Sequence, residues 1–111
     1  MSTSQIKIDV TLDEKKIPEL IRWNATDGEF DEPRTARSML LSFWDPEEQN
    51  TLSIDLWTKE LTVEEMNIHF FQVIKKLCGT YLKATNNKEM EELFINFGNN
   101  FAKKSGIAKK D

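Results

Sequence analysis

A long amphipathic segment from Thr62 to Ala84 constrains the fold more than any other feature of the sequence. Thr62-Val-Glu-Glu65 has the spacing of a capping box, in which the two side chains satisfy backbone N–H groups at the start of a helix. Apolar side chains then recur at helical spacing: Met66, Phe70, Phe71, Ile74, Leu77, Cys78, Tyr81 and Leu82. A helix of this length is about 35 Å long, comparable to the diameter of a small domain. We therefore expect it to cross a β-sheet and to pack on the apolar face of that sheet.

Three shorter segments alternate between apolar and polar residues, which is the period of a half-buried strand. These segments are residues 6–12, 17–25 and 52–57. The polar turn from Asp13 to Lys16 joins the first two as a hairpin, with Pro18 near the beginning of the second strand. Helical spacing returns over residues 90–101, after Asn86-Asn87, and Ser105-Gly106 ends that segment.

Residues 31–44, between the second and third of these strands, have the pattern of a further helix. Asp31 or Glu32 would cap it, Pro33 would occupy its first turn, and Asp45-Pro46 would end it. Its apolar stripe would consist of Ala36, Met39, Leu40 and Phe43. The sequence thus predicts an α+β fold in the order β-β-α-β-α-α. The long helix and a C-terminal helix would pack on a small three-stranded sheet. The sequence does not determine the order of the strands in that sheet.

The length of 111 residues fits a single domain, 1–111, with frayed termini at 1–4 and 107–111. No apolar run approaches the roughly 20 residues of a membrane span, and the first residues lack the features of a signal peptide. The single cysteine, Cys78, precludes an internal disulfide and suggests a reducing compartment, hence the cytoplasm. The net charge of −4 disfavours nucleic acid as a partner.

The residues that most often carry chemistry do not form a catalytic or metal-binding pattern. His69 is the only histidine, and Cys78 lies nine positions further along the same predicted helix, about 180° around its axis. One histidine and one cysteine cannot supply a zinc site, and the acids at 27–32 lack the spacing of a calcium loop. The four glycines are scattered, which excludes a phosphate-binding loop. We therefore predict no catalytic residue, no metal and no cofactor.

Trp57 is the most informative side chain, because strand alternation places it with Asp55, opposite Leu52, Ile54 and Leu56. Leu20 and Arg22 occupy the corresponding outer face of the second strand. Tryptophan and arginine are frequent at binding hot spots, so Leu20, Arg22, Asp55 and Trp57 are the candidate partner-binding residues. In the alternative interpretation, a helix covers this face and Trp57 belongs to a second core.

Three ordered strings give the chain a resemblance to a known family. They are Ile21-Arg-Trp-Asn-Ala-Thr-Asp-Gly28, Met39-Leu-Leu-Ser-Phe-Trp-Asp45 and Thr51-Leu-Ser-Ile-Asp-Leu-Trp-Thr-Lys59, followed by Val63-Glu-Glu-Met66. Together they resemble the gliding motility protein GldC family of Bacteroidetes over nearly the whole chain. The resemblance implies a cytoplasmic accessory component of surface gliding, associated with a machinery linked to protein secretion, and it brings no catalytic residues.

The leading hypothesis is therefore a non-enzymatic accessory or assembly protein that binds protein components of the gliding and secretion apparatus. One alternative is a small-ligand-binding or enzymatic domain with a pocket near His69 and the Asp27–Asp31 loop. Another is a dimeric, chaperone-like factor for a secretion substrate, which would be a homodimer with an exposed apolar groove.

Overall fold

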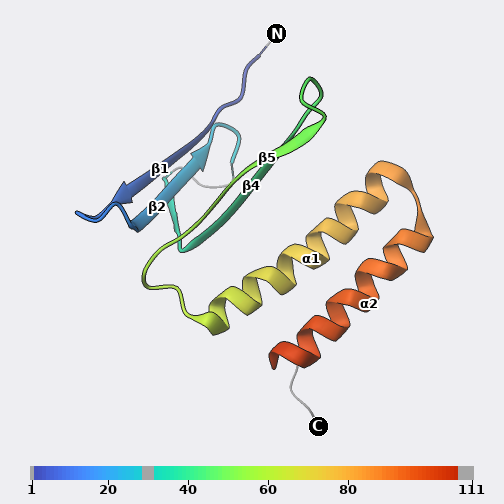
Figure 1. Cartoon of the computed structure of the whole chain (residues 1–111). Helices are drawn as coiled ribbons and strands as arrows, with labels where there is room; N and C mark the ends of the chain where they lie inside the picture. The colour runs from blue at the N-terminus through green and yellow to red at the C-terminus, as the bar shows by residue number, and fades with distance from the viewer. Residues whose placement is uncertain (1, 29–31, 108–111) are drawn as a thin grey trace. The chain divides into compact units, whose positions relative to one another are not determined.

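The computed structural model describes residues 2–28 and 32–107, and within these ranges all the strands precede both helices (Figure 1). The elements are β1 (Ile6–Leu12), β2 (Pro18–Ala25), β3 (Arg34–Ala36), β4 (Ser38–Asp45), β5 (Asn50–Trp57), α1 (Val63–Thr85) and α2 (Lys88–Ser105). The α+β class is confirmed. The order β-β-α-β-α-α is wrong.

The chain divides into two compact units, a strand unit at Met1–Leu61 and a helical unit at Thr62–Asp111. Packing of the long helix on a sheet, and the single domain with frayed termini, stay predictions. Of the residues predicted to fray, Met1 and residues 108–111 lie outside the described residues.

β1, β2 and β3 form an antiparallel sheet in that order, and its register places apolar side chains on one face. Val10 lies opposite Ile21, which in turn lies opposite Ala36. Side chains of Ile6, Ile8, Trp23 and Ala25 share this face, whereas Lys7, Asp9, Arg22 and Thr35 lie on the other. Ile21, on the central strand, is only 1% exposed. The predicted β1–β2 hairpin is confirmed, with Pro18 as the first residue of β2.

β4 and β5 form a separate two-stranded ribbon, and this corrects two predictions. Residues 34–36 and 38–45 are strands β3 and β4, so the helix predicted over residues 31–44 is wrong. Its proposed cap, Asp31, lies outside the described residues. The third predicted strand, now β5, pairs with β4 and not with the first hairpin, so the three-stranded sheet has a different membership.

The helix prediction failed because the apolar residues at 38–45 fit both the 3.6-residue period of a helix and the two-residue period of a strand. Met39, Leu40 and Phe43 fit a helical stripe, but Met39, Leu41 and Phe43 fit one face of a strand equally well. Pairing decides between them, since Leu41 lies opposite Ile54 and Phe43 opposite Leu52. The Asp45 carboxylate accepts hydrogen bonds from the backbone N–H groups of Glu47 and Glu48, at 2.9 and 3.3 Å, and closes the turn between the strands.

The ribbon joins the rest of the strand unit at Arg37, where β3 gives way to β4. The backbone N–H of Thr58, directly after β5, donates to the Arg37 carbonyl at 2.8 Å. The N–H of Lys59 then donates to the carbonyl of Pro18 at the start of β2, at 3.3 Å. Thr58 is 2% exposed. The ends of the ribbon are therefore joined at the buried Thr58.

The helical unit is a hairpin of α1 and α2, and α1 confirms the predicted capping box (Figure 1). Thr62 Oγ1 accepts from the Glu65 N–H at 3.0 Å, and Glu65 Oε1 accepts from the Thr62 N–H at 3.1 Å. Asn86, in the left-handed conformation with φ of 55°, ends α1. The Asn87 side chain caps α2.

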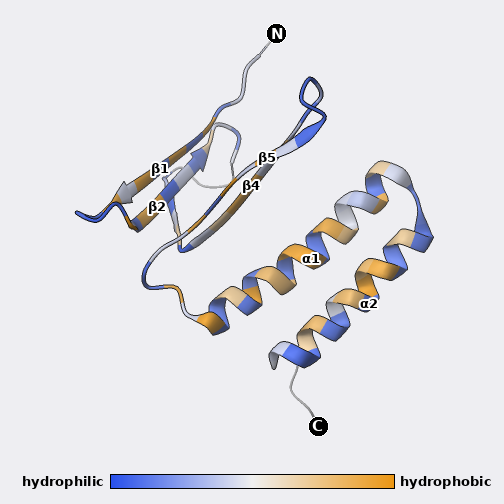
Figure 2. Ribbon diagram, viewed as in Figure 1, coloured by the Kyte–Doolittle hydropathy of each residue, from blue (hydrophilic) through white to orange (hydrophobic). Residues whose placement is uncertain are grey.

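Small residues on α2 bring the two helices close together. Gly98 and Ala102 are buried, and an added Cβ at Gly98 would lie 3.4 Å from Ile74 Cγ2. The rings of Tyr81 and Phe94 are 5.7 Å apart. Apolar residues outside this contact stay exposed, among them Phe70, Leu77, Leu93 and Phe97. Figure 2 shows apolar positions along both helices and along β4 and β5.

Candidate functional site

The four predicted partner-binding residues lie on two different sheets. Leu20 and Arg22 lie on β2, on the face opposite the buried Ile21. Asp55 and Trp57 lie on β5, two residues apart and therefore on one face of the ribbon. The structure keeps each pair together, but it does not place them on the shared sheet that the sequence predicted.

The ribbon adds two residues that the sequence analysis missed, Trp44 and Leu40 on β4. Trp57 lies opposite Ser38, Asp55 opposite Leu40, and Thr51 opposite Trp44. Because directly paired residues share a face, these side chains belong to the face of Asp55 and Trp57. We define the tryptophan face as Leu40, Trp44, Asp55 and Trp57. The alternation of Leu40 and Trp44 with Met39, Leu41 and Phe43 would have revealed it, had residues 38–45 been assigned to a strand.

Both faces of the ribbon are exposed, since Phe43 and Ile54 on the opposite face are 57% and 53% exposed, but the two faces differ in chemistry. Trp44 and Trp57 are 63% and 57% exposed. Six register positions separate them, or roughly 20 Å of strand. Hydroxyl side chains lie between them, and Ser53 Oγ donates to Asp55 Oδ2 at 3.4 Å. The opposite face carries three consecutive apolar pairs, which are Met39 with Leu56, Leu41 with Ile54, and Phe43 with Leu52.

The ribbon is an acidic part of the chain. Residues 38–58 contain Asp45, Glu47, Glu48 and Asp55 but no lysine, arginine or histidine. The ribbon therefore carries a charge of −4, as do residues 27–32, which also hold four acids and no base. No ion pair among the described residues engages any of these four carboxylates.

An apolar hollow of about 230 Å³ lies at the junction of the three-stranded sheet and the ribbon. Its lining is Ile6, Ile8, Ile21, Trp23, Ala36, Ser38, Met39 and Leu40. Leu40 thus belongs both to this hollow and to the tryptophan face. The apolar surface of the ribbon continues into the first sheet on this side.

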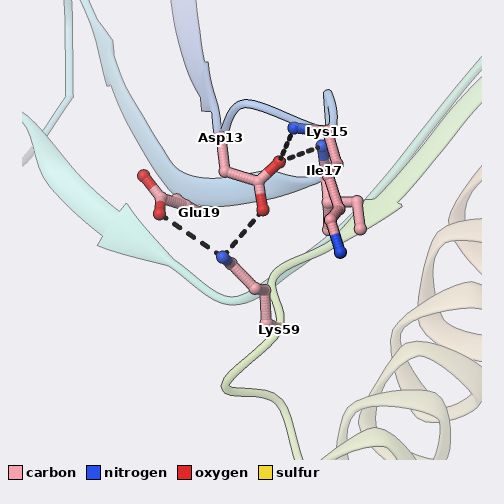
Figure 3. A network of polar contacts seen from close by, with 5 residues as sticks. All are labelled: Asp13, Lys15, Ile17, Glu19 and Lys59. Carbon is pink, nitrogen blue, oxygen red and sulfur yellow. Dashed lines mark hydrogen bonds and ion pairs between the residues drawn. The ribbon is translucent and has the colours of Figure 1, made fainter.

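A polar network holds the end of the strand unit (Figure 3). Lys59 Nζ lies 2.8 Å from Asp13 Oδ2 and 3.4 Å from Glu19 Oε1. The other oxygen of Asp13 accepts from the backbone N–H groups of Lys15 and Ile17, at 2.8 and 2.9 Å. Lys59 thereby ties the segment after β5 to the β1–β2 turn and to β2.

The sequence profile that describes gliding motility-associated, GldC-like proteins matches residues 18–107. The chain belongs to the GldC-like family. The match runs from the first residue of β2 to just past α2, and it includes all three tryptophans and Lys59. Neither the curated proteins nor the solved structures with which the chain was compared contain a match. The resemblance seen in the sequence is confirmed, and the family associates this GldC-like protein with gliding motility.

The network of this GldC-like chain shifts the pKa values of two of its members. The hydrogen bond from Lys59, with help from the Ile17 N–H, lowers the pKa of Asp13 below the usual 3.8, although desolvation opposes this. The same bond raises the pKa of Lys59 above 10.5, again against desolvation. A depressed carboxyl pKa means that the interaction stabilises the fold above 3.8 and that this contribution is lost as the pH falls through the folded pKa.

Lys59→Met should raise the pKa of Asp13 towards 3.8 and weaken the acid dependence of stability. The expected result is less difference in unfolding free energy between about pH 7 and about pH 2.5 than in the wild type. An NMR titration of the Asp13 carboxyl carbon and urea unfolding at both pH values measure this. Lys7→Met is the matched control, since Lys7 lies 3.9 Å from Asp9 at an exposed site. An Asp13 titration unaltered by Lys59→Met would contradict the assignment.

The residue types that most often support catalysis are dispersed in the GldC-like fold. Cys78 Sγ donates to the Glu91 carbonyl at 3.7 Å and lines a groove of about 200 Å³ between α1 and α2. The rings of His69 and Phe70 form a T-shaped pair with centroids 6.4 Å apart. Within residues 2–28 and 32–107, no three acidic, histidine or cysteine side chains gather where they could hold a metal ion. The alternative pocket near His69 and the Asp27–Asp31 loop involves residues 29–31, outside the described residues.

Neither α1 nor α2, the helices of the described chain, combines the length and apolarity of a membrane-crossing helix.

Proposed function

We propose that this GldC-like protein is a non-enzymatic, cytoplasmic accessory protein of the gliding machinery that binds a protein component through the tryptophan face. The observation that carries the proposal is the pair of exposed tryptophans, Trp44 and Trp57, on one face of a ribbon. Tryptophan is enriched at binding hot spots because it combines a large apolar area with an N–H donor.

The composition of the two ribbon faces favours the tryptophan face over the opposite one. An all-apolar face such as that of Leu41, Phe43 and Ile54 is typical of a surface that packs in a protein core. Aromatic side chains interspersed with hydroxyls and a carboxylate are typical of an interface that also exists free in water. A two-stranded ribbon is marginally stable alone, which leaves one face for the fold and the other for a partner.

Trp44→Ala combined with Trp57→Ala should reduce partner capture at least about tenfold. The measurement is crosslinking in the gliding cell followed by affinity purification and quantification of the captured proteins. Leu20→Ala with Arg22→Ala is the comparison variant, because these predicted site residues lie on the other sheet, and it should capture normally. If the folded tryptophan variant captures the same protein at the wild-type level, the surface assignment is wrong.

A further inference from the structure

We propose that the partner segment that docks on the tryptophan face is basic, an extended stretch of protein that carries arginine or lysine side chains. This inference rests on the proposed function and names the chemistry of its partner. It combines the exposed tryptophans of the ribbon with the charge that surrounds them.

Charge complementarity carries the argument. The ribbon holds four carboxylates and no base between residues 38 and 58. Asp55 lies on the tryptophan face, and Glu47 and Glu48 lie in the turn that follows Trp44. Since no described cation pairs with them, an incoming cation would meet unneutralised carboxylates.

The aromatic rings favour the same partner. Arginine and lysine stack on the face of tryptophan, and arginine does so while it also reaches a carboxylate. A nucleic acid or an anionic membrane surface presents the same sign of charge as the ribbon and would be repelled. The roughly 20 Å between Trp44 and Trp57 corresponds to about seven extended residues.

Two synthetic peptides of about nine residues test the inference, one with arginine and one with glutamate at alternating positions, both without tryptophan. The arginine peptide should shift the indole N–H resonances of Trp44 and Trp57, assigned through Trp→Phe variants, and the glutamate peptide should not. Raising the salt from about 100 mM to about 500 mM should weaken the binding of the arginine peptide several-fold. Equal binding of the two peptides would overturn the proposal.

Charge variants test which carboxylates the arginine peptide contacts. Glu48→Gln with Asp55→Asn should weaken binding of the arginine peptide roughly fivefold. Glu14→Gln with Glu92→Gln removes the same charge elsewhere and should leave binding intact. Asp45 is left in place because it closes the turn. Equal affinities of the two charge variants would contradict the inference.

Other occupants of the surface give distinct results. Stronger binding to phosphatidylglycerol vesicles than to the arginine peptide would assign the surface to a membrane and overturn the inference. A dimer in light scattering that Trp44→Ala with Trp57→Ala dissociates would assign it to a second copy of the chain.

Capture from the gliding cell separates this inference from the proposed function. If the tryptophan variant loses the partner but Glu48→Gln with Asp55→Asn retains it fully, the binding function stands and the basic partner is wrong. If the tryptophan variant retains the partner, the binding function itself fails.

Discussion

Ile21→Ala is expected to lower the free energy of unfolding of the strand unit by about 2 to 5 kcal/mol. Ile21 lies on the central strand, between Val10 and Ala36, and is 1% exposed. Truncation removes buried methyl groups and leaves a cavity that the paired backbone on both sides of β2 cannot close. No other large side chain in the described chain is as completely buried.

Tryptophan fluorescence during urea unfolding measures this effect selectively, because Trp23, Trp44 and Trp57 all lie in the strand unit. Leu20→Ala is the matched control. Its side chain occupies the preceding position of the same strand, faces the other way, and is 37% exposed, so a loss below about 1 kcal/mol is expected. Equal losses for the two variants would show that the described apolar face is not the core of this unit.

Gly98→Leu is expected to separate α1 from α2 and to destabilise the helical unit by about 2 kcal/mol. An added Cβ at Gly98 already lies 3.4 Å from Ile74 Cγ2, so a methyl group fits at van der Waals contact but a larger side chain does not. The tilted rings of Tyr81 and Phe94, 5.7 Å apart, depend on the same approach of the helices.

Two further variants test whether helix contact causes the destabilisation by Gly98→Leu. Gly98→Ala should be neutral or stabilising by up to about 1 kcal/mol, since alanine favours a helix. Gly79→Leu places the same large side chain on α1, where an added Cβ meets nothing within 4 Å, and should not destabilise. Circular dichroism at 222 nm during urea unfolding reports on both helices. A Gly98→Leu variant as stable as Gly79→Leu would refute the close packing.

The elements whose apolar residues follow only one period, either that of a helix or that of a strand, could be predicted from the sequence. α1 carries a capping box and a long stripe, so its observed span, Val63–Thr85, differs from the expected one by a residue at its end. β1, β2 and β5 alternate clearly. Residues 38–45 could not be assigned, because their apolar side chains fit two periods and only the pairing with β5 distinguishes them.

That error propagated to the candidate site. Asp55 and Trp57 were correctly grouped, since alternation within one strand needs no knowledge of its neighbours. Leu20 and Arg22 would share a face with Trp57 only if β5 paired with the first hairpin, and strand pairing is a long-range property that periodicity does not encode. Trp44, which shares the face of Trp57, was hidden inside the predicted helix. The acidity of residues 38–58 is visible in the sequence alone. Only the pairing of β4 with β5 shows that these acids belong to one ribbon.

The junction of Arg37 with the buried Thr58 also allows the length of the ribbon to vary. Both of its ends meet at one hydrogen bond of 2.8 Å, so its length can change at the turn, at residues 46–49, without altering the register of β1, β2 and β3. Insertions or deletions of two residues in each strand keep every side chain on its face. Relatives that differ in this way would carry the same sheet while they move Trp44 closer to Trp57 or further from it. The spacing between Trp44 and Trp57 can thus evolve separately from the stability of the three-stranded sheet.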